Sequence, residues 1–157
     1  MENLISKEKV LQLAFADGEY ISPEAIADYD IAAATDRYIM PIVGTELMEA
    51  MQAGTYTSLV DEYVAPALAM SVRTMIQAAL NVRTGQCGLS IASSYRSDTS
   101  TKSAIVALNI SLAKRRKTLL RRLSNHLKNN ASLYPEYSVQ GDALQKCSLD
   151  GGLVQVY

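Results

Sequence analysis

Residues 101–130 constrain the fold more than any other part of the sequence, because they predict one long helix with two different faces. At about 100° per residue, six apolar side chains fall within a single stripe roughly 100° wide. They are Ile105, Leu108, Leu112, Leu119, Leu123 and Leu127. A stripe of that length has to pack against other elements, so we expect the rest of the chain to supply helical partners.

The opposite face of this helix is basic. Four cations share an arc of about 60°, and two more flank them. The four are Lys114, Lys117, Arg121 and Lys128, and the flanking pair is Arg115 and Arg122. Arg116 is the exception, because it points into the apolar stripe. Its charge must extend past the edge of the core or meet a carboxylate from another element.

Charge is divided unevenly along the chain. Residues 99–135 hold eight Lys and Arg and no Asp or Glu, whereas residues 1–98 hold six basic and thirteen acidic side chains. Residues 136–157 hold one basic and three acidic side chains. Such asymmetry indicates that the basic element faces an anionic partner, either nucleic acid or the acidic face of a neighbouring copy. A solvated basic helix face explains the same pattern equally well.

Composition favours an all-α protein. Trp is absent, Phe occurs once, and twenty residues are Ala, which suits close-packed helices better than a β-sandwich. We expect about five helices in an irregular bundle forming one domain over residues 1–140, with a C-terminal tail or arm over 141–157. The predicted helices before the basic one cover residues 6–16, 22–38, 44–53 and 58–83.

Prolines and caps set these boundaries. Ser22 with Pro23 matches the chemistry of a helix start. The helix that follows should end near Tyr38, because Pro41 disfavours helical geometry at the residue before it. The helix over 58–83 is apolar nearly all round and is therefore predicted to be the central core element. Pro66 lies inside it and predicts a kink or a break there.

A long Ser/Gly-rich loop is expected over residues 84–103, where eleven of twenty residues are Ser, Thr or Gly. Long loops in compact domains are commonly functional. Polarity alternates over residues 89–92, which permits a short strand or β-hairpin. The candidate docking residues in this loop are Leu89, Ile91, Tyr95 and Arg96.

The end of the predicted domain is marked by aromatic residues. Tyr134 and Tyr137 on either side of Pro135 predict a turn that docks on the long helix and closes it. The tail after Gly141 has the composition of an extended arm.

Catalysis has little support in the sequence. His126 is a lone histidine among basic neighbours, and no phosphate-binding glycine loop or zinc-ligand spacing is present. Asp28 and Asp30 fall on different faces of a helix and are expected to be solvated with Asp36. We therefore expect no enzyme, no catalytic or metal site, no cofactor and no small-molecule substrate. No segment reaches the roughly 18 apolar residues of a membrane span, so no membrane partner is expected.

Three short stretches carry a resemblance to a known family. The run 38–48, YIMPIVGTELM, resembles the helix, proline, glycine and short-helix signature of head-to-tail connector (adaptor) proteins of tailed bacteriophages and prophages, especially those of Bacteroidetes. Residues 61–69, DEYVAPALA, resemble the proline-bearing core helix of that family. Residues 133–137, LYPEY, resemble the turn after its last helix. The acidic residues expected at the start of that last helix are replaced here by basic ones.

The resemblance implies a structural protein of the virion neck, made in the cytoplasm of a bacterial host. Such proteins form a homo-oligomeric ring below the portal protein, surround the DNA channel and dock the next neck or tail protein. The basic face would then contact the neighbouring subunit or make non-specific contact with DNA, and we favour the subunit contact. The alternative is a small helical DNA-binding regulator or packaging protein.

Overall fold

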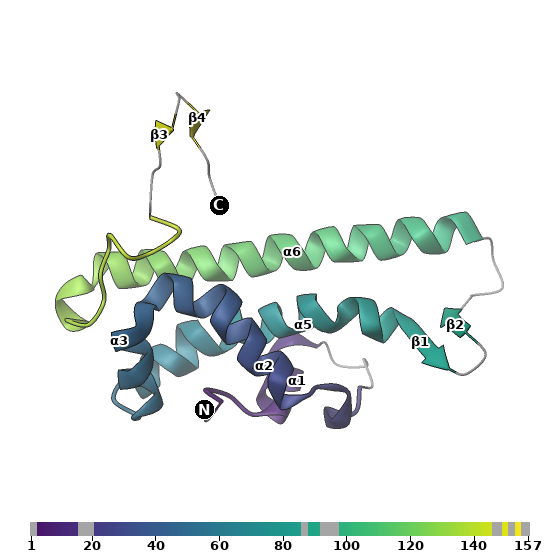
Figure 1. Cartoon of the computed structure of the whole chain (residues 1–157), viewed down its shortest axis with the longest axis horizontal. Coiled ribbons are helices and arrows are strands. Elements are labelled where there is room, and N and C mark those ends of the chain that lie inside the picture. The colour runs from purple at the N-terminus through teal and green to yellow at the C-terminus, as the bar shows by residue number, and fades with distance from the viewer. Residues whose placement is uncertain are drawn as a thin grey trace.

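A computed structural model describes residues 3–15, 21–85, 88–91, 98–145, 149–150 and 153–154, with side chains for 3–15, 21–80 and 102–145. The all-α class is confirmed. The longest helix, α6 (Asp98–Asn129), runs along the molecule beside α5 (Ala65–Asn81), as Figure 1 shows. Helices from the N-terminal half pack against α5, which therefore occupies the centre of the fold.

The central position of α5 follows from its apolar circumference. Leu68, Val72 and Ile76 are buried, as the sequence predicts for the core element. Arg73 is also buried in α5: its guanidinium donates to a carbonyl at the C-terminal end of α1 (Lys7–Ala14) and lies 4.4 Å from the centre of the Phe15 ring. A cation at a helix C-terminus is favourable because the last carbonyls carry partial negative charge.

The predicted helix over 22–38 is divided in two. Ser22 caps only a single 3₁₀ turn, η1 (Pro23–Ala25), and Ile26 then takes an extended backbone with its side chain fully buried. A new helix, α2 (Asp28–Ala34), starts after this break. Burial of Ile26 therefore interrupts a helix whose start signals the sequence carries.

Pro41 does not end the second helix, so the boundary predicted at Tyr38 is wrong. The five residues before Met40 form a π-helical segment, η2 (Thr35–Ile39), in which the Met40 N–H donates to the Thr35 carbonyl. The helix then continues into α3 (Met40–Gln52). In an α-helix, a proline ring clashes with the carbonyl four residues earlier. We attribute the presence of Pro41 within this helix to the wider π turn that precedes it. The helix breaks instead at Gly44, whose φ of 78° and ψ of 172° are non-helical.

A π-helical segment also precedes Pro66. The helix begins with α4 (Thr57–Leu59), passes through a second π-helical segment, η3 (Val60–Val64), and continues as α5. The Ala65 N–H donates to the Val60 carbonyl across the wide turn. The proline thus produces a local change of helix type where the sequence predicts a kink or a break.

The stretch predicted as a loop, residues 84–103, contains strand structure at its start and helix at its end. β1 (Val82–Gly85) pairs antiparallel with β2 (Gly88–Ile91), and α6 already begins at Asp98. Both strands lie at the far end of α5 from the helical body (Figure 1).

The C-terminal segment returns along the body after α6. A 3₁₀ turn, η4 (Ala131–Leu133), reverses the chain, and residues up to 145 then pack on the helices, so the body extends past the expected boundary at residue 140. Beyond it, β3 (Leu149–Asp150) pairs with β4 (Leu153–Val154) away from the helices (Figure 1).

Candidate subunit-contact surface

The basic face of α6 is exposed to solvent, as its helical spacing predicts. All six predicted contact cations have exposed side chains: Lys114, Arg115, Lys117, Arg121, Arg122 and Lys128. The Arg122 guanidinium lies 4.7 Å from the centre of the Tyr63 ring, and Lys128 Nζ donates to the Gln145 side chain. Within the described side chains, the ion pairs of this protein involve Lys7 and Lys9 and none of these cations. The face therefore presents its charge outward.

Arg116 contacts an aromatic residue, Tyr38. The carboxylate partner that the sequence analysis offered as one possibility is not the partner seen here. Its Nη1 donates to the Tyr38 hydroxyl at 3.1 Å, and its guanidinium carbon lies 4.4 Å from the centre of the same ring. Tyr38 belongs to the π-helical segment η2. This contact joins the α2–α3 helix to α6, and it keeps the Arg116 charge half-buried at the edge of the apolar stripe.

A groove of about 630 Å³ opens beside this contact. It lies between the α2–α3 helix, the middle of α6 and the returning C-terminal segment. Seven apolar residues line it: Pro41, Ile42, Ile110, Ala113, Leu120, Ala143 and Leu144. Four cations and Tyr38 complete the lining, the cations being Arg37, Lys114, Arg116 and Lys117. No Asp or Glu is among these described residues, so the groove suits an apolar group that carries negative charge beside it.

A buried polar network holds the C-terminal wall of the groove. Asp142 is fully buried, and its Oδ2 accepts hydrogen bonds from Ser124 Oγ at 2.6 Å and from the Tyr137 hydroxyl at 2.7 Å. Its Oδ1 accepts from the Leu144 N–H at 2.8 Å. Burial, followed by the hydrogen bond to Asp142, raises the pKa of Tyr137 above its ordinary value. A carboxylate with three donors is well satisfied in the interior.

The chain also returns to Pro41. The Ala143 N–H donates to the Pro41 carbonyl at 2.9 Å, which fixes the groove's two non-α6 walls to each other. Tyr134 and Tyr137 are buried, so the predicted aromatic turn does close α6.

His126 has packing and hydrogen-bonding partners in the body. Its ring stacks on Tyr63 with centroids 3.9 Å apart, and its Nε2 lies 3.2 Å from the Tyr134 hydroxyl. Burial raises the pKa of Tyr134. Among the residues that the structure describes, no group of three or more His, Cys, Asp or Glu side chains could hold a metal ion. The described helices also include none that is both long and apolar enough to span a bilayer.

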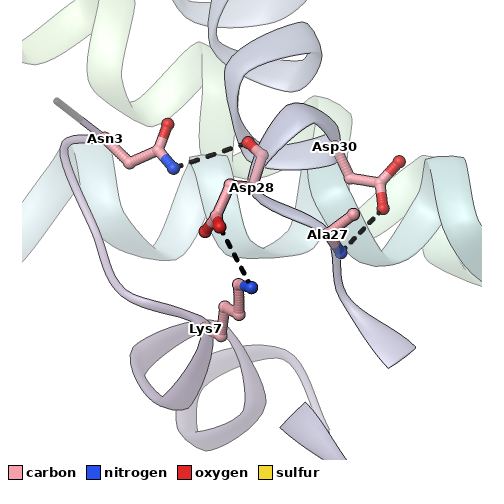
Figure 2. A network of polar contacts seen from close by, with 5 residues as sticks. All are labelled: Asn3, Lys7, Ala27, Asp28 and Asp30. Atoms are coloured by element: carbon pink, nitrogen blue, oxygen red, sulfur yellow. Dashed lines mark hydrogen bonds and ion pairs between the residues drawn. The ribbon is translucent and has the colours of Figure 1, made fainter. Parts of the chain in front are cut away.

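Asp28 and Asp36 are exposed, as expected, while Asp30 is partly buried. The two carboxylates at the start of α2 also have partners. Lys7 Nζ pairs with Asp28 Oδ2 at 3.1 Å, and Asp30 Oδ2 accepts the Ala27 N–H at 3.0 Å; Figure 2 shows both contacts. The Asn3 side chain donates to the Asp28 carbonyl at 3.4 Å. These contacts fix both carboxylates at the helix N-terminus, where negative charge is favourable.

Two of the four predicted docking residues lie in the described part of the chain. Leu89 and Ile91 lie in β2. Tyr95 and Arg96 lie outside the described residues.

The groove itself was not foreseen from the sequence. Its walls come from residues 37–42, 110–120 and 143–144, and no local pattern indicates that these stretches meet. One signal did exist, because Arg116 interrupts an otherwise apolar stripe and therefore requires a partner at that position.

The matched family model covers residues 32–144, more than half of the chain, and is described as a family of unknown function, DUF6712. The matched region includes η2, Pro41, Pro66, the basic face and the buried network. No curated protein and no solved structure matches the chain.

Proposed function

The chain belongs to the DUF6712 family, and because that family has no assigned function, we propose one from the surfaces of this molecule. We propose that the protein is a structural component of a tailed-phage neck. It assembles as a homo-oligomeric ring below the portal protein, joins head to tail around the DNA channel and docks the next neck or tail protein. It carries out no chemistry, and it acts in the virion neck after synthesis in the bacterial cytoplasm.

The observation that carries the proposal is the exposed, uniformly basic face of α6 on a chain whose first 98 residues carry a net negative charge. A ring with cyclic symmetry needs two different complementary surfaces on each subunit. Opposite charges on two parts of one chain supply such a pair, and they also favour the correct register during encounter. The resemblance of residues 38–48, 61–69 and 133–137 to connector proteins supports the same role.

Native mass spectrometry over a wide concentration range tests the proposal. We expect a closed species of many subunits that is weakened by salt, because charge attraction between exposed groups is screened. Charge reversal at Lys117 and Arg121 should abolish this species while circular dichroism shows an unchanged helical monomer. Lys102→Glu is the control, since it reverses another exposed cation of α6 outside the basic face. Assembly that survives the double reversal would refute the contact model.

The second candidate is a small DNA-binding regulator or packaging protein, which the same exposed cations favour because they could contact phosphates. A salt titration of DNA binding separates the two functions. Sequence-dependent binding near physiological ionic strength would support the regulator, whereas weak binding with a steep salt slope fits a channel wall or an incidental patch.

A further inference from the structure

Tyr29 is the most exposed large apolar side chain in the described part of the protein, with 75% of its surface accessible. It stands in the first turn of α2 between Asp28 and Asp30. Both carboxylates are held in place beside it, Asp28 by Lys7 and Asp30 by the Ala27 N–H (Figure 2). Tyrosines of this kind are frequent anchors of protein interfaces, because they bury a large ring at a small cost in conformational entropy.

The groove beside Tyr38 has the complementary properties. Its apolar walls suit an aromatic ring, and about 630 Å³ leaves room for a tyrosine side chain with part of its flanking backbone. Arg37, Lys114 and Lys117 supply exposed positive charge around it. A guanidinium also binds the face of an aromatic ring favourably.

A molecule cannot fill its own groove with its own Tyr29. The groove begins at Arg37 and reaches Ile42 on the continuous helix that also carries Tyr29. At about 1.5 Å per residue, those positions lie roughly 12–20 Å along the helix axis from Tyr29. The occupant must therefore come from another molecule.

We infer that Tyr29 of one copy inserts into this groove of the next copy, with Asp28 and Asp30 facing the groove's cations. The inference rests on the proposed ring assembly and identifies one of its contacts. Because anchor and groove are different surfaces of the same chain, the contact is heterologous and repeats from subunit to subunit.

Two variants that each lose one side of the contact provide the test. Tyr29→Ala removes the anchor and leaves the groove intact, while Ala113→Trp fills the groove and leaves the anchor intact. Leu133→Ala is the control for the first, because it removes another highly exposed apolar side chain. Arg37→Glu is a second groove variant at an exposed position, in case the tryptophan disturbs the fold. Circular dichroism establishes folding, and native mass spectrometry at several concentrations reports assembly.

We expect each single variant to raise the protein concentration at half assembly about tenfold or more, and the control to leave it unchanged. A mixture of Tyr29→Ala with Ala113→Trp should give a 1:1 heterodimer that grows no further, because only one anchor and one groove remain. If the wild type forms a ring and both variants assemble normally, the anchor is wrong while the ring proposal stands. A groove variant that fails to assemble while Tyr29→Ala succeeds shows that the groove has another occupant. A wild type that is monomeric at all concentrations overturns both the anchor and free ring assembly.

Discussion

Replacing Tyr137 by Phe removes one hydroxyl from the interior and tests what holds the C-terminal segment on the body. That hydroxyl donates at 2.7 Å to a carboxylate oxygen of Asp142, a residue with no accessible surface. The aromatic ring stays in place, so the substitution changes one hydrogen bond and little packing. Asp142 keeps its bonds from Ser124 and from the Leu144 N–H.

The expected loss in the free energy of unfolding is about 2 kcal/mol, because hydrogen bonds to charged groups contribute roughly 1.5–3 kcal/mol. For a chain of this length, that loss lowers Tm by roughly 4–8 °C. Adding Ser124→Ala removes the second donor to the same oxygen. The two substitutions should therefore be non-additive by about 0.5 kcal/mol or more.

Urea unfolding followed by circular dichroism at 222 nm measures these differences, with Tyr29→Phe as the control because its hydroxyl group is on an exposed side chain. We expect the control to stay within about 0.5 kcal/mol of the wild type. The reasoning is refuted if Tyr137→Phe also stays within that limit, since the buried bond would then contribute nothing measurable.

Three further predictions concern stability. Gly44→Ala should lower the free energy of unfolding in urea by about 1–3 kcal/mol, because the φ of 78° and ψ of 172° at this position suit only glycine. Backbone strain is the whole cause, since an added Cβ meets no atom within 4 Å. An unchanged urea midpoint would contradict this prediction. Arg73→Met should lower thermal stability by about 1–3 kcal/mol, since it removes the buried bond to the end of α1 and the contact with the Phe15 ring; Lys102→Met is the exposed control. Burial raises the pKa of both Tyr134 and Tyr137 in the folded protein. The contribution of the two protonated hydroxyls to the free energy of unfolding is therefore complete below pH about 10 and is lost as pH rises above it. Alkaline unfolding that is no steeper in the wild type than in Tyr137→Phe would contradict the raised pKa of Tyr137.

Local chemistry accounts for the parts of the fold that the sequence predicted well. Ser6 caps α1 by accepting the Lys9 N–H. Gly54, with a φ of 82°, follows the C-terminal end of α3. The stripe of α6 is buried at Leu112, Leu123 and Leu127. Each of these features depends on residues within a few positions of one another, which is the range over which helical periodicity and capping act.

The errors arose where the tertiary structure overrides a local rule. A proline predicts a helix end, yet Pro41 is accepted because η2 widens the preceding turn. Ser22 and Pro23 predict a long helix, yet burial of Ile26 in an extended conformation stops it after one turn. The groove brings residues 37–42 together with residues 110–120 and 143–144, which lie more than sixty positions later in the chain, so only the folded arrangement reveals it.

The order in which the chain is synthesised bears on when the subunit can associate. Tyr29 and the Pro41 wall of the groove emerge early, but Ala143 and Leu144 complete that groove only after about a hundred further residues. At translation rates of roughly 5–20 residues per second, this interval lasts about 5–20 s. Under the proposed contact, a growing chain therefore carries the Tyr29 anchor before its own groove is complete, so it could bind to a finished subunit before another Tyr29 could bind to it.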